Sequence, residues 1–202
     1  FGSDALRYYL IRHVPTTSDA NYTDDILRQS YNGELADQLG NLVQRTIRLL
    51  ELYADGAIPQ PSNYTPLDEK LRRTAADVGL QISDAVAHDA LHHALGAVWD
   101  LVAATNKYIV ETRPWDLAKA CDPAQDAQVN ERLDTCLYVL AESLRIIGVG
   151  LRPFLPETAD AICGRIGYGK RVDDVPWIRQ LTWGNAPIGA NVQSGPPLFP
   201  KV

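Results

Sequence analysis

Residues 24–53, DDILRQSYNGELADQLGNLVQRTIRLLELY, decide the fold because they predict one long amphipathic helix. Along this stretch the residues of one helix face recur at the 3.6-residue spacing of an α-helix: Leu35, Leu39, Leu42, Thr46, Leu49 and Tyr53. Gly56 and Pro59 follow and are expected to end the helix. Because a helix with such a stripe must bury it against other elements, the rest of the chain has to supply partners.

The remaining sequence predicts further helices with stripes of the same kind. A second helix is expected from Leu67 to about Ala85, after Pro66, whose missing N–H needs no partner at a helix start. Others are expected over 89–112, over 129–152 and from Pro156 to near Gly167, with a short segment at 4–15. The prediction is an all-α fold, an antiparallel bundle of about five helices.

The end of the chain has a different character. Residues 168–202 contain five prolines and predict an irregular C-terminal tail, in which a short hairpin near Trp183 is one alternative. Trp177, Trp183 and Phe199 are expected to pack this tail back on the bundle.

Composition favours a folded chain and argues against several classes of protein. Hydrophobic residues make up 46% of the 202 residues, enough for a substantial core. No run of about 18 apolar residues occurs, so no membrane span is predicted. The N-terminus lacks the order of a signal peptide, and the absence of methionine suggests an excised piece. A net charge of −6 argues against coating nucleic acid, although it allows one or two bases to be read locally.

Two polar residues and one tryptophan form the candidate binding site. Asn41 and Arg45 lie one helical turn apart, on the flank of the apolar stripe, and Trp115 follows Pro114, which is expected to end a helix at Arg113. Hydrogen-bonding groups and an aromatic plate can hold an unstacked base by its edge and its face. Arg45 donates, and Asn41 donates and accepts, so the pair suits cytosine and disfavours uracil, which presents N3–H. From spacing alone, an Asn and an Arg one turn apart are usually a solvated helix flank, and a lone tryptophan is more often a packing residue.

The sequence offers less support for a metal-binding or catalytic site than for a binding site. His88 and His92, four residues apart, could share a metal, but no third ligand is evident, and helix-surface histidines explain them. Cys121, Cys136 and Cys163 form no C-x-x-C pair and are interpreted as reduced thiols. No phosphate-binding loop, dinucleotide fingerprint or nucleophile elbow occurs, so no catalytic residue, metal or cofactor is assigned. Asn106, near an apolar stripe, is expected to bond a neighbouring helix or the chain near Trp115.

Several stretches resemble a known enzyme family. Asp4-Ala5-Leu6-Arg7-Tyr8-Tyr9-Leu10 resembles the segment that follows the catalytic half of class I aminoacyl-tRNA synthetases. Stretches similar to methionyl-tRNA synthetases in particular lie at 39–45 (LGNLVQR), 106–111 (NKYIVE), 114–119 (PWDLAK), 151–156 (LRPFLP) and 197–201 (PLFPK). The resemblance runs in order along nearly the whole chain.

The resemblance implies a domain organisation and a site. Residues 1–20 would end a stem-contact region or linker, 21–168 would form the α-helical anticodon-binding domain, and 169–202 would be a C-terminal extension. In that family Asn41, Arg45 and Trp115, with Pro114 beside the stacked base, would read the CAU anticodon of tRNA(Met). Asp37 stands where relatives often carry another Asn, and its carboxylate is expected to repel phosphate.

The same resemblance implies a parent enzyme, methionine–tRNA ligase, that uses ATP and Mg²⁺. The HIGH and KMSKS signatures do not occur in these 202 residues, so this part alone is expected to be non-catalytic. The implied partners are the tRNA(Met) anticodon loop and the enzyme's own catalytic domain, in a cytoplasmic monomer. The alternative is a helical protein-interaction or structural module without RNA specificity.

Overall fold

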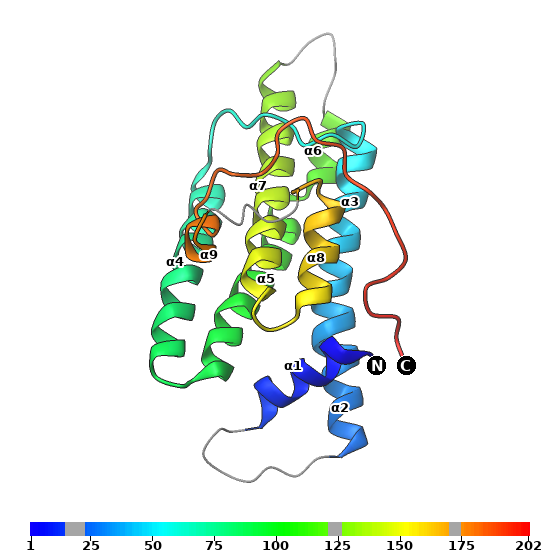
Figure 1. The fold of residues 1–202 in the computed structure, drawn as a ribbon. Helices are drawn as coiled ribbons and strands as arrows, with labels where there is room; N and C mark the ends of the chain where they lie inside the picture. Colours follow the sequence, from blue (N-terminus) through cyan, green and yellow to red (C-terminus); the bar gives the residue numbers. More distant parts are fainter. Residues whose placement is uncertain (15–22, 121–126, 170–174) are drawn as a thin grey trace.

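The computed structural model of the chain describes residues 1–14, 23–120, 127–169 and 175–202. The all-α prediction is confirmed, and the ribbon forms a bundle of long helices (Figure 1). Its elements are α1 (Ser3–His13), α2 (Asp24–Ser30), η1 (Tyr31–Gly40), α3 (Asn41–Tyr53), α4 (Pro66–Ala87), α5 (Leu91–Thr112), α6 (Pro114–Ala120), α7 (Ala127–Leu151), α8 (Pro156–Arg165) and α9 (Trp177–Gln180). Cys121 and the predicted domain boundary at residue 20 lie outside the described residues.

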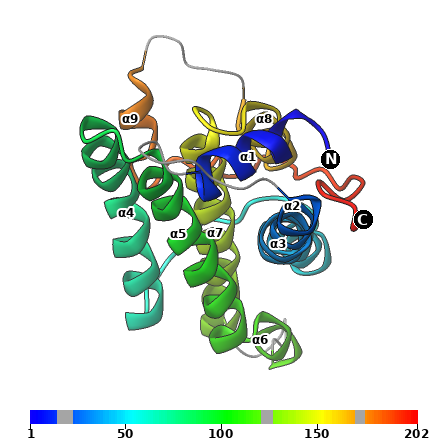
Figure 2. The same ribbon diagram turned by 90° about the horizontal axis from the view of Figure 1, so that it is seen from below.

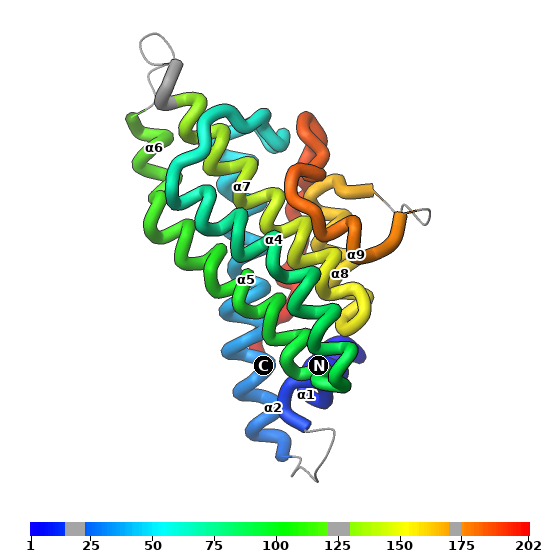
Figure 3. Tube along the Cα trace, turned by 90° about the vertical axis from the view of Figure 1, so that its left-hand side faces the viewer, coloured from blue at the N-terminus to red at the C-terminus, as the bar shows by residue number. Residues whose placement is uncertain are grey.

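Helix α7 forms the centre of the bundle. Every residue from 135 to 151 is buried, because α3, α4, α5, α6 and α8 all pack against this helix. Helices α4, α5 and α7 run side by side, with the rod of α2, η1 and α3 next to them (Figures 2 and 3). The predicted helix partners thus bury the stripe of the first helix.

The first predicted helix is continuous over 24–53, but its middle section is π-helical. Its large buried side chains, Tyr31, Leu35 and Leu39, continue a spacing of four that begins at Leu27 in α2. In an α-helix such a spacing drifts about 40° per step, whereas the wider i→i+5 turn keeps these side chains nearly in line. The four-residue spacing is therefore the sequence signal for the π-helical section. A search for the 3.6-residue spacing of an α-helix does not detect it.

Helix α1 lies across one end of the bundle and is tied to the turn between α7 and α8 (Figure 1). Asp4 is buried, and its carboxylate accepts bonds of 2.7 Å from both the backbone N–H and the hydroxyl of Thr158, in the first turn of α8. Arg7 donates to the carbonyl oxygens of Pro153 (3.2 Å) and Phe154 (2.6 Å). Asp4 therefore caps α8 from a distant part of the sequence, which favours negative charge at that N-terminus.

We expect the Asp4→Ala variant to lose about 1–2 kcal/mol of the free energy of unfolding, the usual cost of a lost N-terminal cap. Urea denaturation would measure this loss. Ser3→Ala, which removes an exposed hydroxyl bonded to Glu157 (3.2 Å), is the matched control and should change stability little. Equal stability of the two variants would contradict the capping role.

The tail packs on the bundle, as predicted. Phe199 is buried, and the Trp177 and Trp183 rings are half-buried against the core. The Trp177 indole N–H also donates to the carbonyl oxygen of Val149 (2.7 Å). The hairpin alternative is wrong: the chain around Trp183 is a turn following α9, and among the described residues the tail's bridge pairing joins Ala57 to Asn191.

Candidate nucleic-acid interface

A sharp corner joins α5 to α6. Arg113 ends α5 in the left-handed region (φ 48°, ψ 63°), an uncommon conformation for a residue with a side chain. Pro114 then starts α6 and is buried. The predictions that a helix stops at Arg113 and that Trp115 lies just past its end are both confirmed. Trp115 occupies the first turn of α6, a helix that the short sequence PWDLAKA did not reveal.

The structure brings the helices of the three predicted site residues together. Helix α6 packs against α3, beside which it lies in two views (Figures 1 and 2). On α3 the side chains of Asn41 and Arg45 are exposed, as their position off the apolar stripe predicts. On α6 the Trp115 ring is half-buried against the core. Within the described part of the chain, no hydrogen bond or ion pair occupies the side chain of Asn41 or that of Arg45.

The exposed stripe of α3 continues past the predicted pair. Arg48 and Leu52 follow Asn41 and Arg45 at helical spacing, and all four are exposed. Arg48 lies 3.6 Å from the carboxylate of Glu51, on the next turn. Arg48 adds a second cation to this exposed stripe, in a protein whose net charge is negative.

The negative charge at Asp37 is compensated. Lys201, from the tail, places its Nζ 2.8 Å from the Asp37 carboxylate, one turn before Asn41. The sequence predicted repulsion of phosphate at this position but missed the lysine, because the two residues are 164 positions apart (201 − 37). Both side chains are largely exposed, so the pair matters more for the local charge than for stability.

Asn106 connects α5 to the helix that carries Asn41. Its side-chain amide donates to the carbonyl oxygens of Gln38 in η1 and Val102 in α5, both at 3.1 Å. The prediction of a bond to a neighbouring helix is therefore confirmed.

A buried polar cluster fixes the last turns of α5. Asp68, at the start of α4, is fully buried and accepts a hydrogen bond from the Tyr108 hydroxyl and two from the Arg132 guanidinium (3.0 and 3.1 Å). Burial raises the pKa of Tyr108, and nearby Cys136 and Asp68 raise it further, so the phenol stays protonated and donates. Burial also raises the pKa of the Cys136 thiol. The cluster joins α4, α5 and α7 beneath the corner that holds Trp115.

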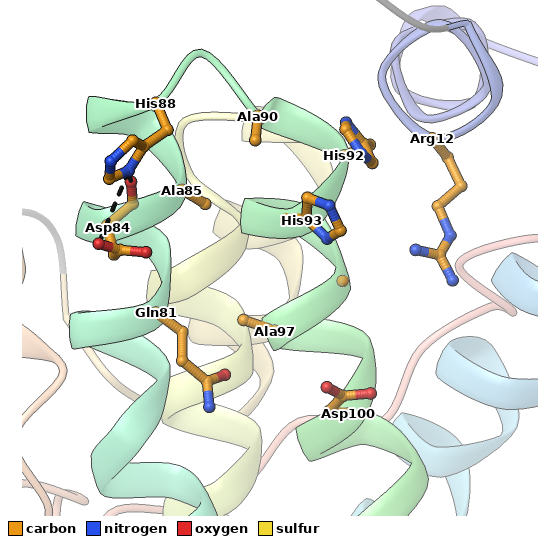
Figure 4. Close-up of a pocket in the computed structure, with 11 residues that line it drawn as sticks. Arg12, Gln81, Asp84, Ala85, His88, Ala90, His92, His93, Ala97 and Asp100 are labelled. Carbon is orange, nitrogen blue, oxygen red and sulfur yellow. Dashed lines mark hydrogen bonds and ion pairs between the residues drawn. The ribbon is translucent and has the colours of Figure 1, made fainter.

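The structure does not bring His88 and His92 together (Figure 4). His88 and His92 line a pocket of about 640 Å³ between α1, α4 and α5, but they stand on opposite sides of it (Figure 4). The His88 ring bonds the carbonyl oxygen of Asp84 (2.8 Å), and His92 stacks near His93, with ring centroids 4.1 Å apart. Within the described ranges, no three His, Cys, Asp or Glu side chains are grouped to hold a metal ion. Cys136 and Cys163 are buried free thiols.

In the described part of the chain, no helix is both long enough and apolar enough to cross a bilayer.

Comparison with known proteins then places the fold. The chain is 37% identical over its full length to the methionine–tRNA ligase of Caldanaerobacter subterraneus subsp. tengcongensis, and 38% identical to that of Halalkalibacterium halodurans. Over its full length the chain is therefore similar to one part of the methionyl-tRNA synthetases. It spans 30% of the length of these two relatives. The profile described as tRNA synthetases class I (M) matches residues 1–47, from α1 to the middle of α3.

Solved methionyl-tRNA synthetase structures have the same architecture. The free form of the Mycobacterium tuberculosis enzyme superimposes with a TM-score of 0.87 at 29% identity, covering 98% of this chain and 38% of that one. The same enzyme with bound methionyl-adenylate gives a TM-score of 0.86 at 29% identity, covering 98% of this chain and 37% of that one. The chain thus corresponds to a helical part of methionyl-tRNA synthetases.

Proposed function

We propose that this bundle reads the CAU anticodon of tRNA(Met) as part of a methionine–tRNA ligase. The observation that carries the proposal is the packing of α3 on α6, which combines unoccupied, exposed Asn41 and Arg45 side chains with a half-buried Trp115 ring. The similarity of the whole chain to methionine–tRNA ligases suggests the substrate class.

The chemistry of the three side chains suits a cytosine at the first anticodon position. Cytosine presents acceptors at O2 and N3, which match the N–H groups of Arg45 and the amide of Asn41. Uracil presents N3–H there and would leave a donor facing a donor. Trp115 offers a plane for stacking, worth about 1–3 kcal/mol per base. Pro114 fixes the first turn of α6 and so orients this ring.

The bundle's contribution to the enzyme would be specificity. ATP and Mg²⁺ would serve the formation of methionyl-adenylate, and we assign that chemistry to the enzyme's catalytic domain, because these 202 residues contain neither HIGH nor KMSKS. Binding energy from the anticodon would place the acceptor end of the tRNA in that distant site. The same proposal includes a monomeric enzyme acting in the cytoplasm.

Anticodon stem-loops that differ only at the first base test the proposal. We expect Asn41→Ala and Arg45→Ala to reduce the preference for cytosine over uracil, and Trp115→Ala to weaken binding of both by about 1–3 kcal/mol. Affinities would be measured at fixed salt, since phosphate contacts make them salt-dependent.

Arg48→Ala is the matched control, because it removes the same charge from the same exposed stripe of α3. It should lower the affinity for cytosine and uracil stem-loops alike. Equal binding of the two stem-loops by the unmodified protein would sink the anticodon assignment and favour the alternative, a helical protein-interaction or structural module.

A further inference from the structure

The helix that carries Asn41 has an unusual beginning. Ten residues of η1 form π-helical turns directly before it, and the N–H of Asn41 itself bonds the carbonyl oxygen of Ala36, five residues back. π-Helical turns are rare and short, and they concentrate at functional sites. A less favourable backbone persists where the surrounding structure holds it in place.

Such holding contacts reach η1 from α5 and from the tail. The Asn106 amide of α5 donates to the carbonyl oxygen of Gln38 at 3.1 Å. Asn32 exchanges two bonds with the backbone of Val202, at 2.8 and 3.2 Å. The Phe199 ring meets Tyr31 edge-on, with centroids 5.8 Å apart. These contacts therefore hold the π-helical section near both of its ends.

Helix α1 holds the first turn of η1 from another side. The carboxylate of Glu34 accepts a bond of 2.9 Å from the hydroxyl of Ser30. Two α1 side chains approach the same carboxylate, His13 at 3.4 Å and Arg12 at 3.8 Å. Three elements of the fold therefore fix the register of one ten-residue segment.

We propose that Asn106 is a positioning residue for base reading, which holds η1 in its π-helical register and thereby aims Asn41 and Arg45. This inference rests on the proposed function. A register change of one residue would turn α3 by about 100° about its axis, enough to move both side chains off the exposed face that they now occupy. Asn106 is best placed for this role because its amide bonds the backbone of Gln38, three residues before Asn41. It does so from α5, the helix that ends at the corner before Trp115.

The test uses the longest natural polypeptide that carries this chain and two anticodon stem-loops, with cytosine or uracil at the first position. We expect Asn106→Ala to lower the cytosine preference by about tenfold, as expected for a misplaced contact. Asn185→Ala is the control, because its amide also donates to a backbone carbonyl, that of Thr182 at 2.8 Å, but far from η1. It should leave the preference unchanged.

A double variant separates positioning from general destabilisation. If Asn106 acts through Asn41 and Arg45, Asn41→Ala combined with Asn106→Ala should lose less preference than the sum of the two single losses. Additive losses, or an unchanged preference in Asn106→Ala, would overturn the inference while leaving the proposed function standing. An unchanged preference in Asn41→Ala would instead overturn the proposed function and, with it, the premise of the inference.

A second single variant guards against a folding defect. Asn32→Ala cuts the link to Val202 near the surface, and we expect a smaller loss of cytosine preference in the same direction. Hydrogen exchange of the amides in 31–40 should quicken in both variants and stay unchanged in Asn185→Ala. Unchanged exchange and preference in Asn32→Ala and Asn106→Ala would contradict the positioning role.

Discussion

Replacement of Arg145 by alanine is expected to lower the free energy of unfolding by about 3–5 kcal/mol, the usual cost of leaving a buried ionic partner alone. Arg145 and Glu142 lie one turn apart on α7, and neither side chain is exposed to solvent. The guanidinium donates to the Glu142 carboxylate at 2.6 and 2.8 Å. Without it, a buried carboxylate loses its countercharge.

The same pair also anchors the tail. The Arg145 guanidinium donates to the carbonyl oxygen of Thr182 (2.7 Å), and Glu142 accepts bonds from the backbone N–H groups of Gly184 (2.7 Å) and Asn185 (3.2 Å). Loss of Arg145 should therefore release the tail around α9 as well as destabilise α7. Because backbone groups depend on both members, the apolar double variant Arg145→Met with Glu142→Leu should also be less stable than the unmodified protein.

Urea denaturation measures the loss, and limited proteolysis reports the release of the tail. Arg179→Ala, an exposed arginine of α9, is the matched control and should change stability by less than about 0.5 kcal/mol. A loss below about 1 kcal/mol for Arg145→Ala, with the tail still protected, would show that the buried pair contributes little to the fold.

The helices could be predicted from the sequence because apolar periodicity reports burial directly. The spacing of Leu35, Leu39 and Leu42 placed the first helix, and Pro114 placed the end of α5, since a residue before proline avoids helical geometry. Helix α6 escaped this reasoning, because seven residues are too few for a periodic pattern to emerge. Its existence depends on the left-handed Arg113, a conformation that tertiary packing selects.

The polar interior was much harder to foresee. Arg145 is the one charged residue within the apolar run SLRIIGVG. Such a position predicts a buried partner but does not identify it. The partner Glu142 precedes it by one turn, but the tail that completes the site lies about 40 positions away and has no periodicity. Long-range ties of this kind, including the one between Asp37 and Lys201, follow from the folded path of the chain.

The candidate site was predictable in part for the same reason. Helical phase placed Asn41 and Arg45 on the exposed flank of α3, where the structure has them. The contact of α6, which carries Trp115, with α3 is a tertiary contact that no local pattern encodes. The π-helical register of η1 adds a further dependence, since it sets the rotation of α3 about its axis.

Asp68→Ala should have a similarly large effect, a loss of about 3–5 kcal/mol in the free energy of unfolding. The Asp68 carboxylate accepts from five donors: the Thr65 N–H (2.6 Å) and hydroxyl (2.7 Å), the Tyr108 hydroxyl and two N–H groups of Arg132. Alanine would strand the half-buried Arg132 guanidinium and the buried Tyr108 hydroxyl without an acceptor. It would also remove the cap at the start of α4.

Asp77→Ala, an exposed carboxylate on the same helix, is the matched control for denaturation and should be nearly neutral. Asp68→Asn should fall between the two, because it keeps one carbonyl oxygen but turns N–H groups toward the donors. Since Tyr108 holds the last turns of α5, we also expect Asp68→Ala to weaken stem-loop binding at temperatures where it is still folded. Unaltered binding by folded Asp68→Ala would mean that the corner at Arg113 and Pro114 holds Trp115 in place without the buried cluster beneath it.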